Sequence, residues 1–120
     1  LDTRKAGFSD EIHDSVDYPE YRRKVVKAIL SGKCEKGIVI SGTGLRISIT
    51  CNRYKGIRAA LCSDCFSAEA TREHNDANIL AMGGRVVGPG LAVKIVDTFL
   101  HTEFSGDERH KRRISKIEDC

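Results

Sequence analysis

The segment Ser41-Gly42-Thr43-Gly44 is the first part of the chain whose residue types could bind an anion. It follows the unbroken apolar run 37–40 and precedes a segment that we expect to form a short helix. Two glycines let the backbone approach a ligand closely, and the unpaired N–H groups at a helix start attract negative charge. The pattern favours an oxyanion or phosphate nest, but an ordinary glycine-rich turn has the same composition. It matches neither the dinucleotide-binding nor the P-loop pattern.

A histidine, an amide and two arginines form the second set of candidates. His74-Asn75 ends a predicted helix, where a histidine by itself is more often a partner for the helix dipole than a catalytic group. Arg109 and Arg113 lie one turn apart at the start of the last predicted helix. Two guanidinium groups on one face suit a phosphate monoester, although a basic surface or a weak nucleic-acid patch is the plainer explanation. Because no aromatic residues are interleaved with these arginines, we do not expect a nucleic-acid partner.

The cysteines do not form a recognisable framework. They are Cys34, Cys51, Cys62, Cys65 and Cys120. Cys62 and Cys65 match a C-x-x-C pattern, which occurs in redox pairs and in half of a zinc site. No second C-x-x-C or histidine pair completes a metal site, so we expect free thiols and no metal.

The composition is that of a globular protein small enough to be one domain. The 120 residues are 40% hydrophobic and 31% charged, and 20 Lys and Arg are balanced by 17 Asp and Glu to a net charge of +3. This mild charge does not require nucleic acid, and no apolar stretch reaches the ~18 residues of a membrane helix. The first residues contain no apolar signal region, so we expect a cytoplasmic protein without a membrane partner. We predict a single domain over 1–120, in which 1–16 form an irregular or remnant segment.

Helices and strands alternate along the predicted chain. The predicted helices cover about 17–32, 45–52, 67–74 and 88–102 and a basic segment from about 107, and the predicted strands cover 37–40, 57–62 and 79–82. The first two strand segments read as strands buried on both faces of a parallel sheet. This alternation predicts an α/β fold with a thin parallel sheet, and a ligand site outside the carboxyl ends of its strands. In the helix 88–102 the apolar residues expected to face inward are Leu91, Val93, Ile95, Val96, Phe99 and Leu100.

Several segments together resemble the type B ribose-5-phosphate isomerases, a family that also includes subunits of galactose-6-phosphate isomerase. They are DYPEY at 17–21, GIVISGTG at 37–44, NRYKGIRAALC at 52–62, REHNDAN at 72–78 and RHKRR at 109–113. Their order and spacing resemble the family nearly everywhere from Asp17 to the C-terminus.

The resemblance implies a fold, an activity and an assembly. The fold would be a flavodoxin-like three-layer α/β sandwich around a parallel sheet. The enzyme would interconvert ribose 5-phosphate and ribulose 5-phosphate in the pentose phosphate pathway, without a metal or other cofactor. It would be a homodimer or a tetramer whose active site is shared between subunits.

The resemblance also implies roles for particular side chains. His74 would open the sugar ring, Asn75 would bind the substrate, and Tyr18 would line the site. The phosphate would be bound by Arg109 and Arg113. The enediolate oxygen would be held by the loop residues Gly42, Thr43, Gly44, Leu45 and Arg46, with Thr43 assisting as a catalytic residue.

The chain departs from the family at the residue that should remove the proton. In most members a cysteine stands where Ser41 is, and a related branch has serine there with a glutamate at the position of Leu45. A serine hydroxyl is a far weaker base than a thiolate unless a neighbour activates it. Ser41 is either an engineered replacement or the natural residue of a divergent homologue. Arg46 replaces a glycine of the family, and it either strengthens anion binding or obstructs the loop.

The first strand and helix of the family, with an Asp-His pair that contacts the substrate, should lie before Asp17. Residues 1–16 contain no segment that resembles them, so we expect this strand and helix to be missing from the chain.

The sequence therefore predicts a ribose-5-phosphate isomerase that is impaired at its base. Two alternatives remain within the same fold: a catalytically silent homologue that binds sugar phosphates, and a galactose-6-phosphate isomerase subunit. A choice between five- and six-carbon phosphates would separate the latter from the pentose enzyme. A redox role for Cys62 and Cys65 is a weaker third alternative.

Overall fold

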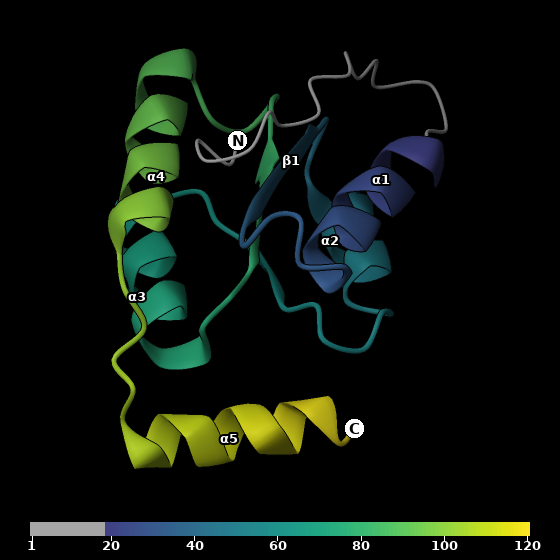
Figure 1. Cartoon of the computed structure of the whole chain (residues 1–120). Coiled ribbons are helices and arrows are strands. Elements are labelled where there is room, and N and C mark those ends of the chain that lie inside the picture. Colours follow the sequence, from purple (N-terminus) through teal and green to yellow (C-terminus); the bar gives the residue numbers. More distant parts are fainter. Residues whose placement is uncertain (1–18) are drawn as a thin grey trace.

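The computed structural model describes residues 19–120 (Figure 1). The start of the helix predicted over 17–32, the residue Tyr18 and the segment 1–16 lie outside the described residues. The irregular segment and the single-domain organisation of 1–120 therefore stay predictions.

Every helix and strand predicted beyond residue 18 is present, with small differences in the bounds. The elements are α1 (Pro19–Leu30), β1 (Gly37–Ser41), α2 (Leu45–Cys51), β2 (Ala59–Leu61), α3 (Cys65–Asn75), β3 (Ile79–Gly83), α4 (Pro89–His101) and α5 (Glu108–Glu118). β2 is shorter than predicted at its start because the Ile57 N–H donates to the Tyr54 carbonyl in the turn that follows α2.

The three strands form a parallel sheet in the order β1-β3-β2. Gly37 pairs with Ile79 at one end of the β1–β3 ladder, and Ser41 pairs with Gly83 at the other. The last strand in the sequence is thus the central one, an order that the alternation of helices and strands did not predict.

The central position of β3 explains which strands are buried. β3 is buried along its whole length. Ile40 of β1 is 41% exposed and Leu61 of β2 is 40% exposed. The prediction that these two strands are buried on both faces is wrong, because in the described part of the chain they are the edge strands of the sheet.

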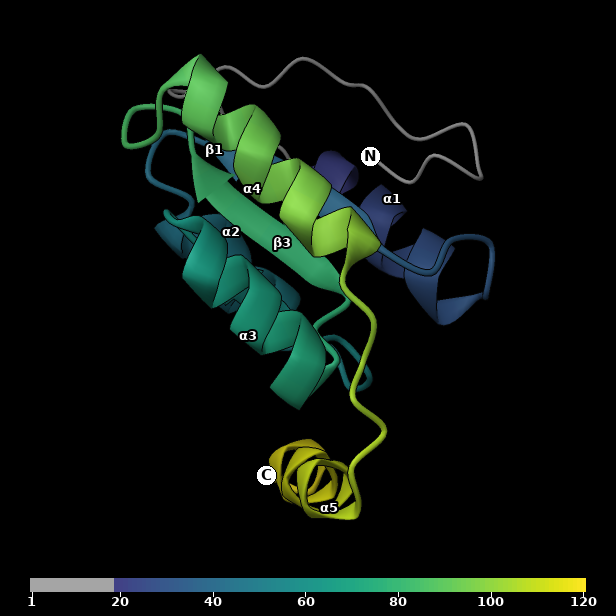
Figure 2. The same ribbon diagram turned by 90° about the vertical axis from the view of Figure 1, so that its left-hand side faces the viewer.

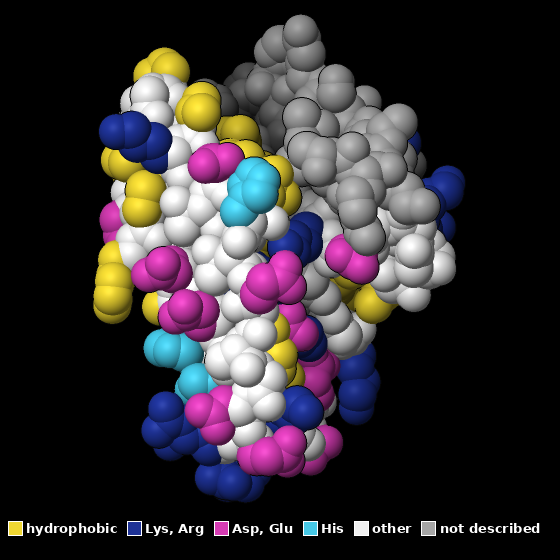
Figure 3. All heavy atoms as spheres, turned by 60° about the vertical axis from the view of Figure 1, so that its left-hand side comes forward, with side chains coloured by type: hydrophobic (Ala, Val, Ile, Leu, Met, Phe, Trp, Pro, Cys, Tyr) yellow, Lys and Arg dark blue, Asp and Glu magenta, His cyan; other side chains and the backbone are white. Residues whose placement is uncertain are grey.

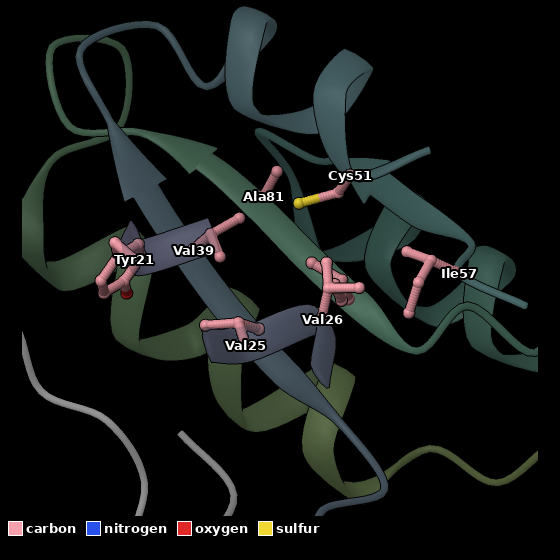
Figure 4. Packing of buried hydrophobic residues seen from close by; sticks show 8 residues of the cluster. Tyr21, Val25, Val26, Val39, Cys51, Ile57 and Ala81 are labelled. Carbon is pink, nitrogen blue, oxygen red and sulfur yellow. The ribbon is translucent and has the colours of Figure 1, made fainter. Parts of the chain in front are cut away.

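Helices cover both faces of the sheet, which confirms the three-layer α/β arrangement. α1 and α2 lie on one face, and α3 and α4 lie on the other (Figures 1 and 2). Alternate residues of β3 serve the two layers: Ile79 and Ala81 pack under α1 and α2, and Leu80 and Met82 pack under α3 and α4. Figure 4 shows the hydrophobic cluster on the first face, which is formed by side chains from α1, α2 and the sheet.

α4 buries a narrower stripe than the sequence predicted. Ile95 and Phe99 are fully buried, whereas Leu91 is 42% exposed and Val93 is 68% exposed. A helix advances by about 100° per residue, so Val93 lies far around the helix from Ile95. The prediction that all six apolar residues of this helix face inward is therefore wrong for Leu91 and Val93.

α5 lies apart from the helical layers, across one end of the sheet (Figures 1 and 2). It is densely charged, and Figure 3 shows Lys and Arg side chains gathered over it with histidine side chains beside them. Within residues 19–120, none of the helices combines the length and the apolar composition needed to cross a membrane.

Candidate active site

The loop Ser41–Gly44 lies at the carboxyl edge of the sheet and is packed against the end of β3. Gly44 has a φ of +79°, and a Cβ there would come within 2.7 Å of the Met82 backbone. A Cβ on Gly83 would come within 2.5 Å of the Thr43 carbonyl oxygen. Both positions therefore require glycine, because a side chain would displace the loop from the sheet.

Hydrogen bonds fix the loop further. The N–H groups of Gly84 and Arg85 donate to the carbonyls of Ser41 and Gly42, at 2.6 and 2.9 Å. The Ser41 hydroxyl accepts the Gly44 N–H at 3.2 Å. Within the described residues no carboxylate or imidazole is bonded to the Ser41 hydroxyl, so nothing there is placed to activate it.

Three further side chains lie at this edge. Leu45 is 53% exposed at the start of α2, and Arg46 is exposed beside it. Arg85, also exposed, follows β3 in the loop bonded to Gly42. Sequence reasoning missed Arg85, although the Gly83-Gly84 stop after an apolar strand indicates a loop at the same edge as Ser41.

His74 and Asn75 lie at the opposite, amino edge of the sheet. They end α3, Asp76 follows in the left-handed conformation with a φ of 48°, and β3 then begins at Ile79. Because β1 and β3 are parallel and in register, the Ser41 loop and His74 are separated by at least the length of β3, roughly 13 Å at the usual rise per residue. One chain therefore does not bring the two groups of candidates together.

The C-terminal end of α5 is tied to the amino edge by a carboxylate. Glu118 accepts the Gly56 N–H at 2.9 Å and pairs with the Arg58 guanidinium at 2.5 Å. Arg58 also donates to the carbonyls of Asn75 and Asp76, each at 3.0 Å. One guanidinium thus joins the end of α3 to the end of α5.

Replacing Glu118 by glutamine should lower the free energy of unfolding by about 1–2 kcal/mol at neutral pH, because it weakens these charge-assisted bonds. Burial tends to raise the pKa of Glu118, but the Gly56 N–H and the Arg58 charge outweigh it, so the pKa lies below its ordinary value. The stabilisation is complete above the unfolded carboxyl's pKa and is lost as the pH falls through the lower folded pKa. Urea unfolding of both proteins over a pH series measures this difference, which should shrink in acid.

The control is Glu108→Gln, since the Glu108 side chain is 85% exposed and pairs only at 3.3 Å with Lys111. This change should alter stability by less than about 0.5 kcal/mol. Equal losses in the Glu108 and Glu118 variants, or a Glu118 effect that persists unchanged in acid, would contradict the anchoring role.

The N-terminal end of α5 is held by His110. His110 is 6% exposed, and its ring centroid lies 4.6 Å from that of the exposed His74. Its Nδ1 is 2.8 Å from the Ser105 hydroxyl. Arg109 and Arg113 are exposed on the same helix, and Arg109 approaches the Asp107 carboxylate at 3.7 Å. The candidate phosphate ligands and the candidate ring-opening histidine are therefore neighbours.

The segment 72–78 combines these candidates with purely structural residues. Arg72 is buried and donates to the carbonyls of Thr102 and Ala77, at 3.0 and 2.8 Å. Its guanidinium also lies over the Phe99 ring. Asn78 bonds the backbone of the Gly56–Arg58 turn through both ends of its amide. Arg58, His110 and Glu118 are the positioning residues that sequence reasoning missed, because their partners are far away in the chain.

A pocket of about 400 Å³ opens beside the amino edge, between the start of β2, the end of α3 and α5. Its polar lining includes Asn75, Thr71 and Arg58. The Ser41 loop does not line it.

The cysteines are free, as predicted. Burial, and then the Asp64 charge, raise the pKa of Cys62 to about 11, which disfavours the thiolate that disulfide exchange needs. The described residues contain no cluster of three or more His, Cys, Asp or Glu that could hold a metal. The raised pKa of Cys62 argues against the redox alternative.

Comparisons with known proteins place the chain in a family of sugar-phosphate isomerases. The family described as Ribose/Galactose Isomerase matches residues 2–117, so the match begins further towards the N-terminus than the predicted Asp17. The chain is 46% identical to ribose-5-phosphate isomerase B of Escherichia coli over 87% of the chain and 69% of that protein. It is 43% identical to D-erythrulose-4-phosphate isomerase of Pectobacterium atrosepticum over 74% of the chain and 59% of that protein. The structure of Clostridium thermocellum ribose-5-phosphate isomerase B superposes with a TM-score of 0.86 at 54% identity, covering 93% of the chain and 75% of that structure.

Proposed function

The chain belongs to the ribose/galactose isomerase family, and on this basis we propose that it interconverts ribose 5-phosphate and ribulose 5-phosphate. These relatives are all named as isomerases of sugar phosphates. One of them is named for a four-carbon phosphate and others for a five-carbon phosphate, so the length of the sugar is the specific part of the proposal.

The reaction needs four catalytic or binding functions, and the chain has a candidate for each. His74 opens the ring, with Asn75 binding the sugar. Ser41 stands where the proton must move between adjacent carbons. The loop residues Gly42, Thr43, Gly44, Leu45 and Arg46 hold the enediolate oxygen. Arg109 and Arg113 bind the phosphate, and Tyr18, outside the described residues, completes the lining.

A second copy of the chain is part of this proposal. In a twofold dimer, the carboxyl edge of one subunit can face the amino edge of the other, and the symmetry produces two identical sites. The placement of the Ser41 loop and His74 at opposite edges supports this assembly, since neither edge carries the residues for all four functions. A tetramer would be a pair of such dimers.

The observation that carries the proposal is the grouping at the amino edge. A ring-opening histidine, a substrate amide and two phosphate ligands all come from one corner, where His110 contacts His74 and lies between Arg109 and Arg113 in sequence. If α5 were only a solvated basic surface, the buried His110 in contact with the exposed His74 would have no role.

One observation favours a second candidate, a homologue that binds sugar phosphates without converting them. The Ser41 hydroxyl accepts the Gly44 N–H, and within the described residues no base is bonded to it. A phosphate clamp with a weak base binds its ligand but turns it over slowly. The two candidates differ in turnover, not in binding.

Removing either arginine of the clamp should weaken ribose 5-phosphate binding. Arg109→Ala and Arg113→Ala should each raise Kd by roughly 10- to 100-fold, the effect of one charge-assisted hydrogen bond to phosphate. Isothermal titration calorimetry with ribose 5-phosphate measures this, and four- and six-carbon sugar phosphates titrated in parallel test the sugar length.

Arg112→Ala is the matched control, because Arg112 is an exposed arginine of the same helix to which we assign no role. It should leave Kd within about twofold. If Arg112→Ala weakens binding as much as the other two variants, the helix acts only through its overall charge and the clamp is wrong.

A further inference from the structure

We propose that His110 is a positioning residue of this reaction: its buried ring, held by Ser105, supports the His74 ring and fixes the start of α5 beside it. The inference rests on the proposed function, since His74 is the residue expected to open the sugar ring. It gives a task to a histidine for which the resemblance implied none.

The burial of His110 is unusual for its helix. Its neighbours Arg109 and Lys111 are exposed, whereas His110 is 6% exposed. The ring it contacts, that of His74, is exposed at the end of α3. The centroids are 4.6 Å apart and the planes are tilted by 37°. One side of the His74 ring therefore rests on His110, and its edge stays accessible to a sugar.

Ser105 takes part in three hydrogen bonds, one of them with the buried ring. Its hydroxyl lies 2.8 Å from His110 Nδ1 and accepts the Asp107 N–H at 3.2 Å. Its own N–H donates to the Glu73 carbonyl at 3.1 Å, one residue before His74. The same residue thus fixes both the His110 ring and the backbone that carries His74.

The charges around His110 favour its neutral form. Burial, followed by His74 and Arg109, lowers its pKa below the ordinary 6.5. The charged and titratable groups that face it are His74 of α3, Arg109 and Arg113 of α5, and Asp107 at the cap of α5, of which Asp107 alone acts to raise the pKa. A proton on His110 would place a cation against the His74 ring and both phosphate ligands. A neutral support avoids this repulsion at neutral pH.

Two variants test the role from opposite sides. Ser105→Ala keeps the ring and removes its hydrogen bond, and His110→Phe keeps an aromatic ring and removes Nδ1. Both are made in the Ser41→Cys protein, and Arg112→Ala in the same protein is the control. We expect kcat for ribose 5-phosphate to fall roughly 10-fold in both variants while KM stays within about threefold. A misplaced catalytic group weakens stabilisation of the transition state more than it weakens binding of the substrate. Circular dichroism melting confirms that each variant is folded.

Imidazole ¹H–¹⁵N NMR is the second readout and needs no activity. In the parent protein His110 should titrate below 6.5, and the His74 signals should shift in both Ser105→Ala and His110→Phe but not in Arg112→Ala. Unchanged kcat together with unchanged His74 signals overturns the positioning role. If the Ser41→Cys protein, the parent of these variants, binds ribose 5-phosphate without turnover, the isomerase proposal is overturned instead. The NMR signals alone then decide about His110: movement in both variants supports the inference, and its absence overturns it.

Discussion

Mixing two inactive variants of this chain is expected to restore isomerase activity. One variant combines Ser41→Cys with His74→Ala, and the other carries Ser41→Ala and retains His74. The Ser41 loop and His74 lie at opposite edges of the sheet, so in the proposed twofold dimer each site would take one edge from each subunit. A mixed dimer then has one site with both the introduced cysteine and His74. Random exchange should recover about one quarter of the Ser41→Cys activity, because about half of the dimers are mixed and half of their sites are intact.

The control mixes the Ser41→Ala protein with a Ser41→Ala, His74→Ala double variant, a pair that cannot form an intact site. Native mass spectrometry establishes that subunits have exchanged before activity is read. If exchanged mixtures stay inactive while Ser41→Cys alone is active, the site lies within one subunit and the shared arrangement is wrong.

The Ser41→Cys change by itself should raise kcat by about 10²-fold or more, the usual contribution of a competent general base. A thiol loses its proton near neutral pH far more readily than a hydroxyl does, and the cysteine would keep the position of the present side chain. Within the described residues the Ser41 hydroxyl accepts a backbone N–H and is bonded to no acid or imidazole. Conversion of ribose 5-phosphate, followed by the ultraviolet absorbance of the ketose, measures the gain.

Ser63→Cys is the matched control, since Ser63 is an exposed serine that follows β2 at the same edge of the sheet and has no assigned role. It should leave kcat unchanged. A wild-type rate equal to that of Ser41→Cys would show that the hydroxyl is already activated and that the expected impairment is wrong. Binding of ribose 5-phosphate without turnover in both proteins would favour the silent sugar-phosphate-binding homologue.

The helices and strands were predictable because their signals are local. The apolar run at 79–82 and the glycines after it predicted a strand, and the structure has β3 at Ile79–Gly83. The errors have local causes as well. Leu91 and Val93 were assigned to the core because they are apolar, but the stripe of α4 that faces the sheet contains Ile95 and Phe99. Helical geometry explains Val93, which lies on the far side of the helix from Ile95, whereas Leu91 lies on the same stripe one turn before Ile95 and is exposed near the start of α4.

The candidate site was predictable in its parts and not in its arrangement. Glycines in the 41–44 loop and arginines one turn apart in 109–113 can be recognised from type and spacing alone. Arg58, His110 and Glu118 could not be recognised, because Glu118 meets Arg58 across 60 positions of the chain and His110 meets His74 across two helices. A sequence pattern contains no information about which distant segments meet.

The sequence by itself determined the alternation of helices and strands, the residues able to bind an anion, and the likeness to sugar-phosphate isomerases. These depend on propensity, periodicity and motif, which act over a few neighbouring residues. Only the tertiary structure decided that β3 is the central strand, that Ser41 and His74 lie at opposite edges, and that His110 is buried beneath His74. These follow from the packing of elements far apart in the chain, whose free energy depends on area buried and hydrogen bonds made only after the fold has closed.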